Sequence, residues 1–270
     1  MLRFGTALWV LLLAHAASVA HYNMLFPSKP SAEKGEMVTF TYQFGHPYEH
    51  ELLDAPKPVE LVVLRPRFPF REVLDIDKAL TKIEVPGADG KKVAAWKFHY
   101  APAERGDYVF VLRTAQIQHD EAKHFIEDTV KVILHVQTQK GWDSTLAPAA
   151  IDIMPYTRPY GLLPGMVFKG RAGSVPYRKN DKYTRDAHPD SGLRVEIERY
   201  NEKPPKNLPP DELVTFQTKT DFDGFFVTTL PTAGWWGVTA LAPPSKDGVG
   251  KDAHTITRRA TLWLHVDENK

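Results

Sequence analysis

The stretch Met37-Val38-Thr39-Phe40-Thr41-Tyr42-Gln43-Phe44 alternates, from Val38 onward, between apolar and polar side chains. Its aromatic residues occupy even positions, with threonine and glutamine between them. Because successive side chains of a β-strand point to opposite faces, this alternation predicts a strand with one buried face. Similar short runs, separated by glycine, proline, asparagine and aspartate, recur from Tyr22 to the end of the chain. Few stretches show a period of 3.6, so we expect an all-β protein.

The first half of the chain contains enough strands for one sandwich. We predict strands near residues 22–26, 36–44, 59–65, 81–85, 92–100, 108–118 and 129–137. Seven short strands in about 120 residues are typical of an immunoglobulin-like β-sandwich, which we assign to residues 21–140. Gly106-Asp107-Tyr108 opens a strand where many such sandwiches carry a corner tyrosine. Ordinary core packing explains Tyr108 equally well, so both interpretations stay open.

A second β-sandwich is predicted over residues 165–270. Strands are expected near residues 166–172, 193–200, 213–220, 224–229, 237–241 and 260–266. Residues 141–164 carry four prolines and no sustained period, which indicates a linker between the two domains.

The N-terminus has the features of a secretory signal peptide. An apolar run from Leu8 to Leu13 follows a single cation, Arg3, and Ser18 and Ala20 are small residues where a signal peptidase reads the chain. We therefore expect residues 1–20 to be removed, so that His21 becomes the first residue. Cleavage after Ala16 is the alternative, and it would leave four residues ahead of that histidine.

Composition excludes several classes of protein. The net charge is +1, which gives no electrostatic footprint for nucleic acid. No later segment reaches about 18 consecutive apolar residues, so we expect no membrane insertion after cleavage. The chain has no cysteine, which excludes disulfides, thiolate metal sites and cysteine nucleophiles. These features favour a soluble periplasmic protein in which nitrogen and oxygen ligands hold any metal.

A free N-terminal histidine offers a metal two nitrogen ligands, its α-amine and an imidazole nitrogen. One further histidine would complete the three nitrogens that copper(II) or nickel(II) prefers. If the first two strands pair as a hairpin about Ser31 and Ala32, residue 21 lies opposite residues 43–46, so His21 and His46 share one end of the sheet. The two loops expected at that pole add further candidate ligands, which are His50, His119 and His124.

We therefore predict His21 and His46 as primary metal ligands, completed from His50, His119 and His124. Each has an ordinary alternative, because His46 precedes a proline and suits a turn, and the others suit solvated loops. Both the amine and the imidazoles must lose protons to bind metal, so binding should weaken as the pH falls.

Several short motifs, in this order, resemble a NikM-like bacterial domain of unknown function linked to nickel and cobalt uptake. They are His21 leading to Pro27, Gly45-His46-Pro47, Gly106-x-Tyr108, Gly141-Trp142, Thr220-Asp221 with Gly224-Phe225, and Ala233-Gly234-Trp235-Trp236. The resemblance implies an exported β-sandwich protein associated with transition-metal uptake. The Thr220 to Phe225 run also resembles the transthyretin-like or carboxypeptidase-regulatory type of small sandwich, which implies that fold for the second domain.

Three functions follow as expectations. The first is a non-enzymatic periplasmic protein that captures nickel, cobalt or copper, or delivers it to a membrane metal transporter. The second is a copper enzyme that uses the same histidine brace for oxidative chemistry. The third is a metal-free carbohydrate-binding or adhesion module, in which Trp235 and Trp236 form an aromatic face. At least one of these tryptophans should pack in the core, because neighbours in a strand point to opposite faces. Hydrolase and phosphate-binding motifs are absent.

Overall fold

The protein is all-β, as predicted. The computed structural model describes residues 21–66, 72–87, 90–118, 124–138, 141–142, 150–174, 188–248 and 253–269. The predicted signal peptide and His119 lie outside these ranges. Two short 3₁₀ turns are described in full, η1 (Asp77–Ala79) and η3 (Asp211–Leu213). None of the helices described in these ranges is long and apolar enough to span a bilayer.

The strands in chain order are β1 (Tyr22–Pro27), β2 (Ser31–Ala32), β3 (Val38–His46), β4 (Glu51–Leu53), β5 (Glu60–Arg65), β6 (Glu72–Asp75), β7 (Thr81–Pro86), β8 (Lys92–Tyr100), β9 (Gly106–Arg113), β10 (Ile117–Gln118), β11 (His124–Val136), β12 (Ile151–Pro155), β13 (Val167–Ser174), β14 (His188–Pro189), β15 (Arg194–Arg199), β16 (Thr215–Lys219), β17 (Phe225–Thr229), β18 (Gly234–Leu241), β19 (Ser245–Asp247) and β20 (His254–Val266).

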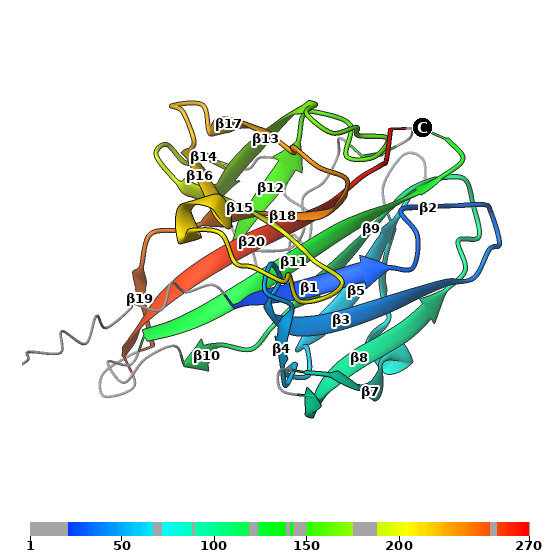
Figure 1. Ribbon diagram of the computed structural model, residues 1–270. Coiled ribbons are helices and arrows are strands. Elements are labelled where there is room, and N and C mark those ends of the chain that lie inside the picture. The colour runs from blue at the N-terminus through cyan, green and yellow to red at the C-terminus, as the bar shows by residue number, and fades with distance from the viewer. Residues whose placement is uncertain are drawn as a thin grey trace, which may run out of the picture.

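These strands form three sheets (Figure 1). The N-terminal sheet has the order β1-β3-β8-β7, with β4 paired to β3. The central sheet has the order β16-β15-β18-β20-β11-β9-β5-β6, with β2, β10 and β19 attached to β11 and β20. The four-stranded sheet contains β12, β13, β14 and β17. One hydrophobic core lies between the central and N-terminal sheets, and a second lies between the central and four-stranded sheets.

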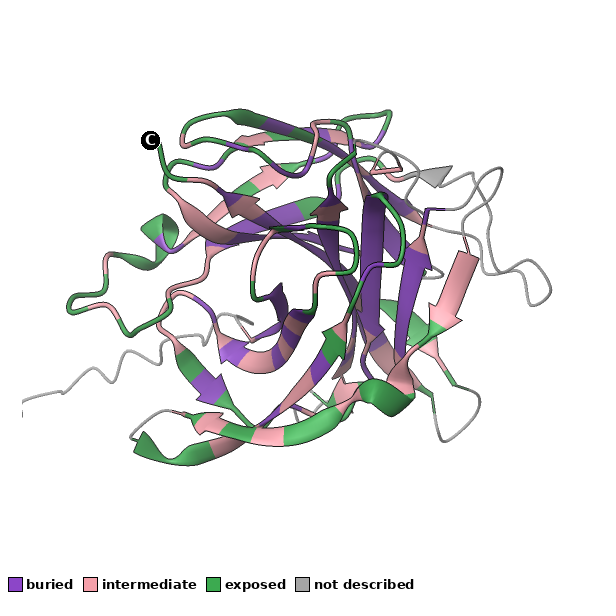
Figure 2. Cartoon of the chain, turned by 90° about the vertical axis from the view of Figure 1, so that its right-hand side faces the viewer, coloured by how far each residue is buried: buried purple, intermediate pink, exposed green. Residues whose placement is uncertain are grey.

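Figure 2 shows that buried residues follow the strands where the sheets face each other. The quoted stretch behaves as predicted: Val38, Phe40 and Tyr42 are fully buried, whereas the intervening threonines are only half-buried. The ring of Phe40 stacks 4.7 Å from that of Phe98. Burial of such a side chain contributes about 1.5–3 kcal/mol, so one face of this strand supplies a large part of its stability.

The central sheet crosses the boundary predicted between the two domains. β11 and β20 pair in parallel from His124 opposite Thr255 to Val132 opposite Trp263. This joins six strands from residues 21–140 to five strands from residues 165–270 in one hydrogen-bonded sheet. The domain limits themselves stay a prediction.

Part of the segment predicted as a linker is a strand. Residues 151–155 form β12, which pairs with β13. The buried Lys131 of β11 donates from Nζ to Asp152 Oδ1 (2.6 Å) and to the Ile153 carbonyl (2.5 Å). A lysine and an aspartate buried to this degree require each other, so this pair fastens β12 to the central sheet.

Tyr108 is a tyrosine corner. Its side chain is fully buried, its hydroxyl donates to the Glu104 carbonyl (3.0 Å), and the Glu104 N–H donates back to it (2.9 Å). These two bonds tie the start of β9 to the preceding turn, as in many sandwiches.

Candidate functional site

His21 and His46 lie side by side at one end of the N-terminal sheet. His21 immediately precedes β1, and His46 is the last residue of β3. Tyr22 pairs with Gly45, so His21 and His46 are the next pair outward, as the hairpin geometry predicts. Their imidazole centroids are 4.3 Å apart, with an angle of 68° between the rings. Both residues are half-buried, and we call them the histidine pair.

Gly45 allows the chain to turn sharply beyond β3. Its φ is +146°, a conformation that side chains disfavour. A Cβ atom at this position would overlap the Glu51 carbonyl oxygen. Only a glycine therefore lets β4 approach β3 closely enough for His46 to pair with Glu51.

A buried arginine holds the main chain of His21. Arg259 of β20 is only 3% exposed and donates from Nη2 to the His21 carbonyl oxygen over 2.8 Å. The same guanidinium binds Asp128 of β11 through two bonds, Nε to Oδ1 (2.6 Å) and Nη2 to Oδ2 (2.7 Å). Bidentate pairs of this kind have both high strength and a fixed geometry. The position of the His21 main chain thus depends on the central sheet as well as on β3.

Asn23 extends this contact into the N-terminal sheet. Its Nδ2 donates to Asp128 Oδ2 (2.5 Å), its Oδ1 accepts from the Tyr42 hydroxyl (2.5 Å), and its carbonyl accepts from Trp263 Nε1 (3.1 Å). Burial raises the pKa of Tyr42, so its phenol stays protonated and acts as a donor. We call Arg259, Asp128, Asn23 and Tyr42 the Arg259 network.

Two buried glutamates of β15 face the same end of β1. The Tyr22 hydroxyl donates to Glu196 Oε2 over 2.9 Å. Glu198 accepts from the Thr215 hydroxyl (2.7 Å) and from the Tyr48 N–H (3.3 Å), which belongs to the turn after His46. Burial raises the pKa of Glu198 to about 8, and neighbouring carboxylates add to this effect. The Glu198 carboxyl is therefore mostly protonated at neutral pH.

The other predicted ligands make different contacts. His50 Nδ1 lies 2.8 Å from the Asn201 carbonyl oxygen, so this imidazole donates to the main chain. His124 is the first residue of β11, and its Nε2 lies 2.9 Å from Thr257 Oγ1. It precedes Asp128 by four strand residues, which is roughly 13 Å along β11. His119 lies outside the described residues.

The histidine pair supplies two imidazoles in one place. Within the described ranges, no group of three or more histidine, aspartate or glutamate side chains is arranged to hold a metal ion. Among the described residues, the α-amine of a processed His21 is the group that would supply a third nitrogen at this position. With that amine exposed, the pair fits a three-nitrogen set.

Sequence reasoning did not identify the Arg259 network. Arg259 and Asp128 are 131 residues apart and meet only because β11 and β20 pair in parallel. The available signal was the placement of each charge inside an apolar strand run, where a lone charge requires a partner. That signal indicates which residues require a partner, but it does not identify the partner.

A family model described as "Domain of unknown function (DUF4198)" matches residues 18–243. No curated protein matches the chain. Among solved structures, Salmonella alpha-2-macroglobulin reacted with methylamine is 14% identical with a TM-score of 0.26, and the alignment covers 92% of this chain and 15% of that one. Escherichia coli alpha-2-macroglobulin activated by porcine elastase is 11% identical with a TM-score of 0.23, covering 90% and 23%. The Yersinia pseudotuberculosis adhesin InvE is 12% identical with a TM-score of 0.20, covering 92% and 59%. The chain thus spans less than a quarter of either macroglobulin, and similarities this low carry no argument about function.

Proposed function

Because the chain belongs to the DUF4198 family, whose description assigns no activity, we propose a function from its own residues: an exported protein that binds a divalent transition metal as cargo. In this proposal His21 and His46 are the primary ligands. The metal is copper, nickel or cobalt, and the protein captures it in the periplasm or passes it to a membrane transporter.

The observation that carries the proposal is the distance of 4.3 Å between the two imidazole centroids. Two imidazoles this close are within reach of one cation. The amine of a processed His21 would add a third nitrogen from the same residue, without any further change in the chain. Three nitrogens suit copper(II) and nickel(II), and the general order of affinities places copper above nickel and cobalt.

The surrounding contacts support a preformed site. The bond from Arg259 to the His21 carbonyl and the pairing of β1 with β3 fix the main chain of both ligands before metal arrives. The absence of cysteine from the chain leaves nitrogen and oxygen as its strong metal ligands. The resemblance to a NikM-like domain supports nickel or cobalt uptake as the physiological setting.

The first experiment is intact mass combined with elemental analysis of protein purified from the exported fraction. We expect a chain that starts at His21 and carries one equivalent of metal. Titration of the metal-free mature chain with copper(II), nickel(II) and cobalt(II) then gives the affinities. Metal at about 100 times its dissociation constant should add about 2.7 kcal/mol of stability.

Two variants test the ligand set. His46→Ala removes one imidazole, and a single alanine added before His21 moves the amine away from the imidazole. Each should weaken binding by about 100-fold or more, because loss of a second-shell partner alone costs 10–100-fold. His99→Ala is the matched control, since His99 lies on β8 with its Nδ1 3.0 Å from Thr39 Oγ1. Unchanged affinity in both ligand variants would rule out the proposal.

The same protein separates a carrier from a copper enzyme. A carrier releases bound metal stoichiometrically and shows no turnover with ascorbate or peroxide. Reductant-dependent oxidation of a substrate by the copper-loaded chain would assign the histidine pair to the oxidative enzyme instead.

A further inference from the structure

Three aromatic side chains form a row across the ends of three neighbouring strands. Trp235 of β18 pairs with His265 of β20, and the Tyr200 N–H donates to the Trp235 carbonyl over 2.8 Å. Residues opposite each other on adjacent strands point to the same face. The centroids of the Trp235 and His265 rings are 5.0 Å apart, and Phe26 of β1 packs against both Tyr200 (4.5 Å) and Trp235 (5.3 Å). We call Tyr200, Trp235 and His265 the aromatic wall.

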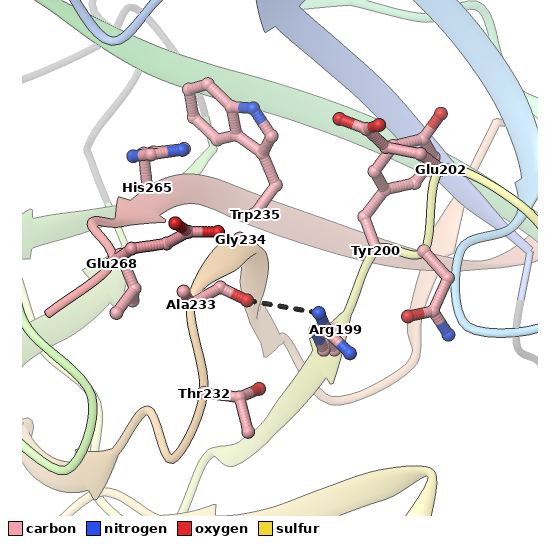
Figure 3. Close-up of a pocket in the computed structure, with 11 residues that line it drawn as sticks. Arg199, Tyr200, Glu202, Thr232, Ala233, Gly234, Trp235, His265 and Glu268 are labelled. Atoms are coloured by element: carbon pink, nitrogen blue, oxygen red, sulfur yellow. Dashed lines mark hydrogen bonds between the residues drawn. The ribbon is translucent and has the colours of Figure 1, made fainter.

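The aromatic wall lines a cavity of about 640 Å³ (Figure 3). This volume is in the range of sites that bind small molecules. Glu202 lies beyond Tyr200 and Glu268 lies beyond His265, and both carboxylates are exposed. The cavity therefore combines a half-buried aromatic surface with a hydrogen-bond acceptor on either side.

One buried hydrogen-bond donor in the lining lacks an acceptor. The indole N–H of Trp235 also makes no hydrogen bond among the residues that the structure describes, but this side chain is half-buried, so water or a ligand can accept from it. Arg199 donates from Nη2 to the Ala233 carbonyl (3.1 Å), but its Nε is buried with no acceptor. An unmet buried donor costs about 1–3 kcal/mol, so such groups call for an explanation.

The neighbouring tryptophan, Trp236, differs from Trp235 because its indole N–H has a hydrogen-bond acceptor. Trp236 is only 3% exposed, donates from Nε1 to the Thr232 carbonyl (2.8 Å), and packs 6.2 Å from the ring of Phe216 in the core. One of the two tryptophans is thus a core residue, as expected. Trp235 is the one whose indole N–H stays available to a ligand.

We propose that this cavity is a binding site for a neutral saccharide, with one face of a pyranose ring against the aromatic wall. The apolar C–H face of the sugar suits the rings, and its hydroxyls both accept from Trp235 and donate to Glu202 and Glu268. An anionic ligand is disfavoured by the two carboxylates. An organic cation is disfavoured by the Arg199 guanidinium, whose buried Nε has no acceptor.

This site is independent of the histidine pair, because neither His21 nor His46 lines the cavity. The test therefore uses the metal-free mature chain. Calorimetric titration and tryptophan fluorescence are measured with cellohexaose, xylohexaose, maltohexaose and chitohexaose, and with spermidine and a hexamer of galacturonate as charged probes. We expect saturable binding of at least one neutral hexasaccharide and no binding of the charged probes.

Substitutions in the wall then locate the site. Trp235→Leu should weaken binding by about tenfold or more, the loss typical of a buried aromatic contact. Because this variant also loses packing on Phe26, the Glu202→Ala/Glu268→Ala double variant removes the two exposed acceptors without touching the core, and it should also weaken binding. Tyr156→Leu is the matched control, since Tyr156 is an exposed aromatic residue on the four-stranded sheet side of the molecule. No binding of any neutral hexasaccharide, preferred binding of a charged probe, or wild-type affinity in both Trp235→Leu and the glutamate double variant would overturn the proposal.

Discussion

Glu198→Gln should remove much of the pH dependence of folding stability. Burial raises the pKa of Glu198 to about 8 in the folded protein, against a usual value of 4.5. Because the folded state holds this proton more tightly, protonation stabilises the fold. The contribution is fully present below pH 4.5 and is lost as the pH rises towards 8. Glutamine is the neutral isostere, and its side chain carries no charge to desolvate at any pH.

The magnitude follows from the shift. Between pH 4.5 and 8 the folded state binds about one more proton than the unfolded state, so the free energy of unfolding falls by about 1.4 kcal/mol per pH unit. Over the whole window this amounts to at most about 5 kcal/mol. Glu49 adds to the cost of ionisation, because its Oε2 is buried without a hydrogen-bond partner and its charge raises the pKa of Glu198.

Urea unfolding of the wild type and Glu198→Gln at pH 5, 7 and 9 measures this directly. We expect similar stabilities at pH 5 and a variant that is more stable by a few kcal/mol at pH 9. Glu202→Gln is the matched control, since Glu202 is exposed and should change stability by less than about 0.5 kcal/mol at every pH. A stability difference between wild type and Glu198→Gln that stays constant from pH 5 to 9 would refute the assignment of a protonated, buried carboxyl.

Four further substitutions test the contacts that build the fold and the site. Arg259→Met leaves Asp128 buried without its cationic partner, so unfolding experiments should show a loss of about 3–5 kcal/mol. The ¹⁵N-histidine spectrum of the metal-free chain should show the His21 signals shifted, and an unshifted spectrum would mean that Arg259 does not position His21. Lys131→Met should lower the free energy of unfolding by a similar amount, about 3–5 kcal/mol, and the double variant Lys131→Met/Asp152→Leu should recover most of that loss in the same assay. A double variant as unstable as the single one would contradict a simple buried pair. Gly45→Ala places a methyl group against the Glu51 carbonyl and should lower the free energy of unfolding in urea by about 1–3 kcal/mol. Wild-type stability of this variant would contradict the close approach of β4 to β3. Tyr108→Phe removes the corner hydroxyl and should cost about 1 kcal/mol, measured by the same unfolding curve, and a neutral effect would show that Tyr108 acts through packing alone.

Local pattern determined the all-β class and most of the strands. The alternation from Val38 to Phe44 encodes which face is buried, because strand geometry sends neighbouring side chains to opposite sides whatever the rest of the chain does. The same local geometry was enough to place His21 opposite His46, since a hairpin between neighbouring strands has few registers.

Tertiary structure decided what connects distant strands. The loop expected near Ser31 and Ala32 became β2, which pairs with the end of β11, and the expected linker contributed β12. The parallel pairing of β11 with β20 leaves no periodic trace in either strand, because each strand reads as an apolar run whichever neighbour it has.

The buried polar contacts show most clearly that the sequence does not reveal which distant residues meet. The charges of Asp128 and Arg259 are visible in the sequence, and so is their need for partners, but their 131-residue separation offers no clue that they satisfy each other. The cavity beside Trp235 is likewise formed by the ends of three strands that come together only in the folded sheet. The sequence alone determined which residues lie in buried strands and therefore require a hydrogen-bond or ion-pair partner. The fold decided which distant group becomes that partner, because partner choice depends on the packing free energy summed over whole sheets.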